Sequence, residues 1–330
     1  MELTYQARLR AVAVIVLGKR PIAGADRALR TVMLDDDEYH TVPRAYATVA
    51  LGQLGDTASL PRLMTWVKGQ PRRGRPSPEK VDLDDPLRGF AAIAMGLYAR
   101  PHPTEQGLVD RPQHERAVER LVETLNDPEQ NAEVRTACAI ALGIAGRSAS
   151  LRPMILVQRT LDPTDDAVLF GHLLLARAML GDRNVVAPAK TLLASAPNRD
   201  EMSDILDRRA AVLALGLTGR DEAIPYLIEA WNETFYVNRE VIYALSLSGA
   251  HGVGTAMIER LEKSGNHFER AYMARSLGEL LSNQQPSRLA ERLLVGREFT
   301  MKDGLLEDAR LIANRFLYEY LIPSFEEPWY

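Results

Sequence analysis

The chain of 330 residues is poor in cysteine and in aromatic side chains. Its one cysteine, Cys138, can form no internal disulfide, and its place on the apolar side of a helical pattern predicts a small buried side chain rather than a reactive thiol. Aromatic residues make up only 6% of the chain, whereas alanine, leucine, arginine and glutamate are abundant, which favours helices over strands. The composition therefore predicts an all-α protein.

Long apolar runs and an excess of basic charge are missing as well. No stretch approaches the roughly 18 consecutive apolar residues that a membrane-spanning helix needs. The 40 basic and 44 acidic residues give a formal net charge of -4, so no global basic excess is present to bind a nucleic-acid backbone. A nucleic-acid partner is therefore disfavoured, and only a continuous basic stripe along the molecule would revive that alternative.

The residue patterns of known catalytic and metal sites do not occur in the sequence. The histidines form no pair with zinc-like spacing, and Cys138 has no cysteine nearby. The acidic residues 35–38 lack the alternating ligands, central glycine and distal glutamate of a calcium loop. Neither a Gly-rich phosphate loop nor a Gly-x-Ser-x-Gly turn is found at a strand-to-helix junction. We therefore expect no enzymatic activity, no metal and no cofactor.

The beginning of the sequence has some likeness to a secretory signal, because two arginines precede the apolar run 11–17. Lys19, Arg20 and Pro21 interrupt this run, however, and Arg10 occupies a position that recurs along the chain. We interpret the segment as a repeat helix and expect a cytoplasmic protein. An extracytoplasmic location stays open if the chain is a trimmed fragment.

One sequence motif recurs along the chain. An arginine stands eight residues before a glycine in six places, at Arg10, Arg44, Arg88, Arg135, Arg208 and Arg270. Apolar residues at helical spacing lead to each glycine, a small residue stands two positions before it, and a second glycine often follows three residues later. A second amphipathic run comes next. The pattern predicts two helices per repeat, and we expect the first glycine to end the first helix in a tight or left-handed turn.

Two more repeats keep the apolar pattern without the arginine. Phe170 and Asn238 stand in its place, before Ala178 and Ser246. The spacing between repeats, about 30 to 47 residues, is typical of proteins in which each helical hairpin buries its apolar face against its neighbours. Asp56 follows its turn directly, where a carboxylate can cap the second helix.

The segments "PRAYATVALGQLGD", "EVRTACAIALGIAG" and "DRRAAVLALGLTG" resemble HEAT-like repeats of the short bacterial type, which are also found in phycobilisome lyase subunits. The resemblance implies an α-solenoid of about eight helical hairpins. It predicts one repeat domain over residues 1–295 and a C-terminal cap with an aromatic tail over residues 296–330. It also implies a ladder that links neighbouring repeats through the six recurrent arginines and through Asp56 and Asp182.

Two long insertions interrupt the array near residues 68–85 and 100–112. The first is a polar loop that carries Arg72, Arg73 and Arg75, which could contact an acidic partner or could simply be solvated. The two insertions join different pairs of helices, and we expect them to emerge on opposite edges of the array.

A protein partner is the function class that this pattern favours. If the second helices line a concave face, their exposed residues form a basic and aromatic strip of Arg27, Arg62, Trp66, Arg152, Lys190 and Tyr226. The alternative, that Trp66 and Tyr226 only cover the core, stays open. Trp329 and Tyr330 end the chain in an aromatic tail that could dock on a partner. We expect a noncatalytic scaffold or assembly subunit. A lyase-type or chaperone-type subunit acting on a cofactor-bearing protein is the alternative.

Overall fold

The computed structural model describes most of the chain up to residue 277. The described residues are 13–14, 16–18, 22–34, 41–69, 85–100, 103–104, 107–108, 112–163, 166–194, 202–233, 238–248, 252–265, 269–270, 273–274 and 276–277. They fall into two compact units, divided between Pro153 and Met154. We call them the N-terminal unit and the C-terminal unit.

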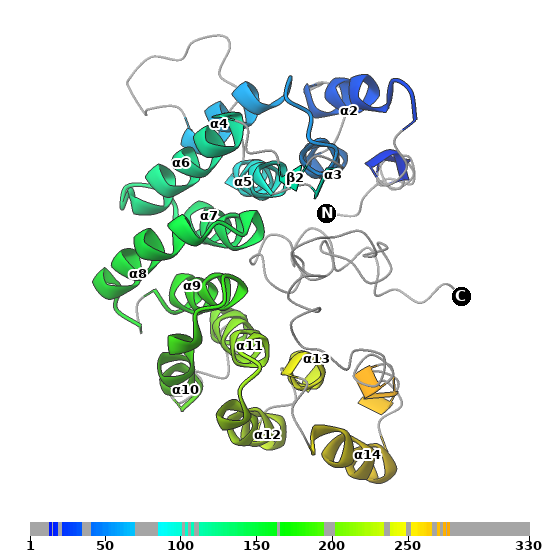
Figure 1. Cartoon of the computed structure of the whole chain (residues 1–330), viewed down its shortest axis with the longest axis vertical. Coiled ribbons are helices and arrows are strands. Elements are labelled where there is room, and N and C mark those ends of the chain that lie inside the picture. The colour runs from blue at the N-terminus through cyan, green and yellow to red at the C-terminus, as the bar shows by residue number, and fades with distance from the viewer. Residues whose placement is uncertain are drawn as a thin grey trace. The chain divides into compact units, whose positions relative to one another are not determined.

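The N-terminal unit consists of helical hairpins stacked in sequence order. Its helices are α2 (Ala25–Leu34), α3 (Thr41–Gln53), α4 (Leu60–Lys68), α5 (Asp85–Ala99), α6 (Pro112–Asn126) and α7 (Ala132–Ala145). The first helices α3, α5 and α7 pack side by side in one row, and α2, α4 and α6 pack against them as a second row (Figure 1). The 3-10 turn Ser148–Ser150 follows α7, and α8 (Leu151–Thr160) crosses the division between the units.

A short antiparallel hairpin lies in the second of the two predicted insertions. Strand β1 (Pro103–Thr104) pairs with β2 (Gly107–Leu108), with Pro103 opposite Leu108. The first insertion separates α4 from α5, and residues 70–84 lie outside the described residues.

The C-terminal unit repeats the same plan. Its first helices are α9 (Ala167–Met179), α11 (Met202–Leu217) and α13 (Asn238–Ser248), and its second helices are α10 (Val186–Ala194), α12 (Ile224–Glu233) and α14 (Val253–Lys263). The 3-10 turns Arg183–Val185 and Asp221–Ala223 lead into α10 and α12. Helix α11 packs between α9 and α13, and each second helix packs against a first helix. Both units therefore confirm the predicted all-α solenoid of helical hairpins.

The first helices are largely buried, and α7 is buried around its whole circumference. In α7 every residue from Val134 to Ala145 is buried. The helix begins where the Asn131 side chain accepts a hydrogen bond from the backbone N–H of Glu133, and it ends at Gly146, whose φ of 68° is left-handed. The core of each unit is thus the row of first helices together with the inner faces of the second helices.

The structure corrects the role that we expected for the first glycine of each repeat. Gly52, Gly96 and Gly216 lie inside α3, α5 and α11 rather than at a left-handed end. The left-handed conformation belongs to the second glycine of the pair, at Gly55, Gly146, Gly181 and Gly219. The first glycine instead faces the next first helix at very short range. A Cβ at Gly216, for example, would lie 2.5 Å from the carbonyl oxygen of Ala244.

Candidate functional site

The recurrent arginines bind the carbonyl end of the preceding second helix. The hydrogen bonds run from Arg44 Nε to the Met33 oxygen (3.2 Å), from Arg88 Nη2 to Val67 (3.0 Å), from Arg135 Nε to Leu125 (3.0 Å) and from Arg208 Nη2 to Leu193 (2.9 Å). The last carbonyls of a helix lack partners within the helix and carry partial negative charge, so a guanidinium stabilises them. These four arginines therefore tie each hairpin to the one before it. Arg270 is exposed, and Arg10 lies outside the described residues.

The turn aspartates pair with arginines that the repeat pattern does not single out. Asp56 Oδ1 accepts from Arg30 Nη1 at 2.5 Å, which links its turn to α2 of the preceding hairpin. The other carboxylate oxygen of Asp56 accepts from the backbone N–H of Ser59 at 3.1 Å and so caps the start of α4. A structural role of Asp56 between hairpins is thus visible, with Arg30 as its partner.

Asp182 belongs to a buried polar cluster in the C-terminal unit. Its Oδ2 accepts from Arg177 Nε (2.9 Å) and Nη2 (2.6 Å), and Oδ1 accepts from the backbone N–H of Asn184 (2.9 Å). Arg177 Nη1 also donates to Gln158 of α8. Burial alone would raise the pKa of Asp182, but the hydrogen bonds from Asn184 and Arg177 and the charge of Arg177 outweigh it and hold the pKa below its ordinary value. This cluster ties α8, α9 and the following turn together in the repeat that has Phe170 instead of the arginine.

Trp66 does not belong to an exposed strip. The residue is only 6% exposed, because it lies on the core side of α4, and the guanidinium carbon of Arg44 is 5.9 Å from the centre of its ring. The prediction that Trp66 contacts a partner is therefore corrected, and the alternative that it covers the core is right.

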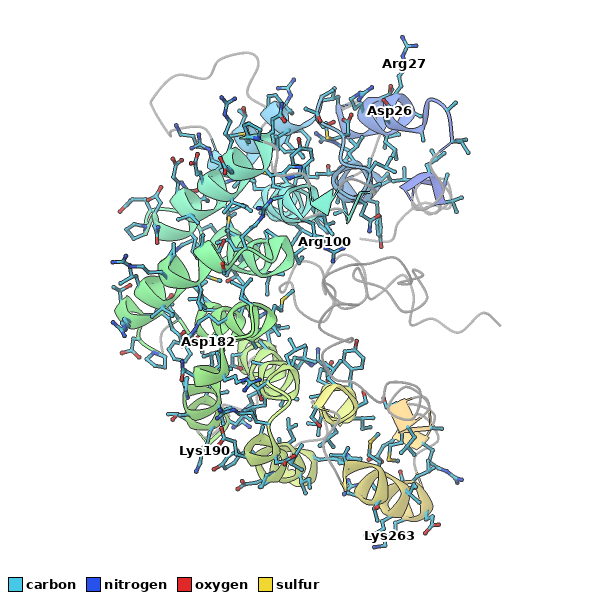
Figure 2. The ribbon with its side chains drawn as sticks, viewed as in Figure 1. Asp26, Arg27, Arg100, Asp182, Lys190 and Lys263 are labelled. Carbon is cyan, nitrogen blue, oxygen red and sulfur yellow. The ribbon has the colours of Figure 1, made fainter. Side chains whose placement is uncertain are left out.

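Three predicted arginines do project from the second helices of the N-terminal unit. Arg27 on α2, Arg62 on α4 and Arg152 at the start of α8 are exposed, and Figure 2 shows Arg27 extending away from α2. Among the described residues none of the three forms an ion pair. Helices α4 and α8 contain no acidic residue. We call Arg27, Arg62 and Arg152 the basic surface.

Lys190 and Tyr226 form a pair between successive second helices of the C-terminal unit. The Lys190 ammonium lies 3.0 Å from the Tyr226 hydroxyl and 4.5 Å from the centre of the ring. The hydrogen bond to Tyr226 raises the pKa of Lys190, so the lysine stays charged. The pair combines a cation with a half-buried tyrosine ring, and tyrosine is enriched among the residues that dominate protein interfaces.

One exposed apolar side chain on α8 was not predicted from the sequence. Leu156 is 51% exposed and stands between Arg152 and Arg159 on one face of α8. The spacing of four and then three residues along a helix was the signal that could have found it. The remaining predicted partner residues, Arg72, Arg73, Arg75, Trp329 and Tyr330, lie outside the described residues.

The one cysteine of the chain has a structural role rather than a reactive one. Cys138 is fully buried, and burial raises the pKa of its thiol to about 12, so it is a core residue as predicted. In the part of the chain that the structure describes, no three His, Cys, Asp or Glu residues gather to hold a metal ion. None of the described helices is both long and apolar enough to cross a membrane.

The stacked hairpins and the arginines that join them define a helical-repeat protein. Residues 43–65 and 207–230, which form the α3–α4 and α11–α12 hairpins, match the family model of the PBS lyase HEAT-like repeat. The chain therefore contains HEAT-like repeats in these two segments, in agreement with its sequence motifs.

Two solved structures are similar to the chain at low identity. The complex of CpcE and CpcF of phycocyanin lyase from Nostoc sp. PCC7120 is 17% identical, with 82% of this chain and 94% of that chain covered and a TM-score of 0.48. Human deoxyhypusine hydroxylase in complex with glycerol is 20% identical, with 73% and 80% covered and a TM-score of 0.36. No curated protein matches the sequence significantly. Neither similarity is close enough to transfer a function.

Proposed function

We propose that the chain is a noncatalytic scaffold that binds an acidic protein surface through the basic surface of its N-terminal unit. The observation that supports this is the exposure of Arg27, Arg62 and Arg152 on second helices, without an ion pair among the described residues. On α6 of the same unit, the half-buried Arg120 is by contrast neutralised by Glu123 at 2.6 Å. Cations that are not neutralised attract acidic surfaces, and arginine is favoured at interface centres.

The repeat architecture explains how such a surface is held. The carbonyl-binding arginines and the Arg30–Asp56 pair fix each second helix relative to its neighbours. Side chains on successive helices therefore keep constant separations, which lowers the entropy cost of binding a partner that contacts several of them. The Lys190–Tyr226 pair is a second contact region on the C-terminal unit.

The test compares two charge reversals of equal size. Arg27→Glu/Arg62→Glu changes the basic surface, and Arg183→Glu/Lys263→Glu changes exposed cations of the C-terminal unit by the same total charge. Each purified protein is used to capture partners from native lysate for quantitative mass spectrometry. We expect specific proteins to be lost with the first variant and kept with the second, and their retention to weaken between about 0.05 and 0.3 M salt. Equal retention by both folded variants contradicts the proposal, as does the absence of any retained protein.

A second candidate is a lyase-type or chaperone-type subunit for a cofactor-bearing protein, which the description of the matching repeat family favours. Both roles begin with protein docking. They differ in the captured partner, because the second requires that the retained protein, or a ternary complex with it, carries a chromophore or other cofactor. An absorbance spectrum of the captured complex separates the two.

A further inference from the structure

The neighbouring second helices α4 and α6 of the N-terminal unit carry opposite charge on their outer faces (Figure 1). Helix α4 contains Arg62 and Lys68 and no acidic residue, and both cations are exposed. Between residues 112 and 130, α6 and the turn that follows it carry five acidic and two basic residues, which gives a formal net charge of -3. An acidic face therefore lies beside a basic one.

The acidic face of α6 follows from the side on which the helix is buried. Its buried residues are His114, Ala117, Leu121, Thr124 and Leu125. With about 100° between successive residues of a helix, Glu119 and Glu123 lie on the opposite side, and both are exposed. Arg120 pairs with Glu123 at 2.6 Å, but among the described residues no ion pair forms at Glu119, and none forms at the two cations of α4. Their charges are therefore open to a partner.

The C-terminal ends of α4 and α6 lie side by side. The recurrent arginines bind the carbonyl of Val67 in α4 and that of Leu125 in α6, both at 3.0 Å, so these two residues hold equivalent positions in their repeats. The side-chain amide of Gln130, which follows α6, also donates to the Lys68 carbonyl at 3.5 Å. The two second helices therefore run in the same direction, with their ends at the same level.

This register places Arg62 of α4 level with the acidic residues of α6. Arg62 precedes Val67 by five residues. Glu119 and Glu123 precede Leu125 by six and by two residues. Because a helix rises 1.5 Å per residue, Arg62 stands about 1.5 Å from the level of Glu119 along the helix axis and about 4.5 Å from that of Glu123.

A basic helix beside an acidic one makes a surface that is complementary to itself. A two-fold axis that runs between α4 and α6, parallel to both, places α4 of one copy opposite α6 of another at the same level. Arg62 then faces Glu119 of the second copy, and the symmetry forms this contact twice. By the same register the exposed Arg116 stands level with the uncharged Ala58, so it opposes no cation. Opposite charges therefore meet across the axis.

We propose that the outer face of α4 and α6 associates with a second copy of the chain in this two-fold arrangement, with Arg62 of each copy paired to Glu119 of the other. Two short helices offer a small contact area, and each exposed ion pair contributes little, so the dimer is weak and dissociates on dilution. This self-association goes beyond the proposed function and does not rest on it. A second copy covers Arg62 and therefore competes with an acidic partner for that arginine.

Analytical ultracentrifugation of the full chain at a series of protein concentrations measures the association. We expect dimers of the parent that weaken between about 0.05 and 0.3 M salt. Arg62→Glu and Glu119→Arg should each raise the dissociation constant roughly tenfold or more, because each change makes both symmetric contacts repulsive. A mixture of these two variants should form dimers again, since each variant supplies the charge that the other one faces. Arg27→Glu, the same charge change on α2, should leave the constant within about twofold of the parent.

Three results would overturn the proposal. The first is a parent that stays monomeric at every concentration. The second is a mixture of Arg62→Glu and Glu119→Arg that associates no better than either variant alone. The third is an equal loss of association in Arg27→Glu and Arg62→Glu, which would mean that the copies meet through general charge and not through α4 and α6. Circular dichroism establishes that each variant is folded. All three results are independent of partner capture from lysate, which tests the proposed function.

Discussion

Gly96 of α5 lies so close to Ala141 of α7 that a Cβ added to the glycine would be 2.4 Å from the alanine carbonyl oxygen. The same relationship joins Gly52 to Ala94 one repeat earlier, again at 2.4 Å. The glycine of one repeat thus requires the small residue of the next, so these two recurrent features of the repeat are the two sides of one helix contact. The distance between neighbouring first helices is set by this contact.

Gly96→Ala should destabilise the protein although alanine is the better helix former. The added methyl group meets backbone atoms that cannot move without separating α5 from α7, and such overpacking costs about 1–3 kcal/mol. Gly265→Ala is the control, because nothing lies within 4 Å of a Cβ there, and we expect a change within about 0.5 kcal/mol. Urea unfolding followed by circular dichroism measures both. Equal stability of the two variants would show that the helices separate without cost.

Arg135→Ala should loosen the end of α6. The variant removes the hydrogen bond from Nε to the Leu125 carbonyl and leaves a buried carbonyl without this donor, at a cost of about 1.5–3 kcal/mol. Hydrogen exchange should become faster in the last turn of α6. Arg62→Ala is the matched control, since Arg62 is exposed, and its effect should stay within about 0.5 kcal/mol. If exchange at the end of α6 does not change, the arginine contributes little to joining the hairpins.

Asp182→Ala should be among the most destabilising single changes in the C-terminal unit. It leaves the Arg177 guanidinium buried without its carboxylate, which typically costs about 3–5 kcal/mol. Arg177→Leu/Asp182→Ala should recover most of the loss, because leucine occupies the equivalent position at Leu142 and Leu215. The exposed Arg220–Glu222 pair provides the control, and Glu222→Ala should cost less than about 1 kcal/mol. If the double variant does not recover stability, the loss comes instead from the missing hydrogen bond between the Asp182 side chain and the backbone N–H of Asn184.

The fold could be predicted from the sequence because the same pattern recurs in several repeats. The sequence of one hairpin alone does not define the fold, but glycine, alanine and arginine at fixed offsets in several repeats indicate a stack of helical hairpins. The role predicted for the first glycine of each repeat is nevertheless wrong. The sequence places Gly96 near the end of its helix, and only the packing shows that Ala141 occupies the space where a side chain would be.

The partner-binding residues were harder to predict, because a shift of two or three residues along a second helix decides whether a side chain is exposed or buried. Trp66 and Arg62 are one turn apart on α4, yet the tryptophan is buried against Arg44 and the arginine is exposed. Arg177 gave a clearer signal, since an arginine stands where the other repeats have leucine or methionine. Its partner could not be read from the spacing alone, because the turn that brings Asp182 back to it depends on the left-handed Gly181.

The Arg177–Asp182 pair should also make stability depend on pH in the acid range. Hydrogen bonds hold the pKa of Asp182 in the folded protein below the ordinary value of 3.8 that applies after unfolding, even though burial alone would raise it. The folded state therefore binds a proton less readily than the unfolded state. The stabilisation from the carboxylate is complete well above pH 3.8 and is lost as the pH falls below that value toward the folded pKa.

Asp182→Asn isolates this contribution. The variant should be less stable than the parent at neutral pH, and the difference should shrink as the pH is lowered below about 4, because a protonated Asp182 resembles asparagine. Some acid sensitivity should remain, since hydrogen bonds from Ser264 and Trp231 and the charge of Arg260 also lower the pKa of Glu269 against the opposing effect of burial. Urea unfolding at a series of pH values gives the difference directly. A stability difference that is the same at neutral and acid pH would mean that Asp182 stabilises this turn by its shape and not by its charge.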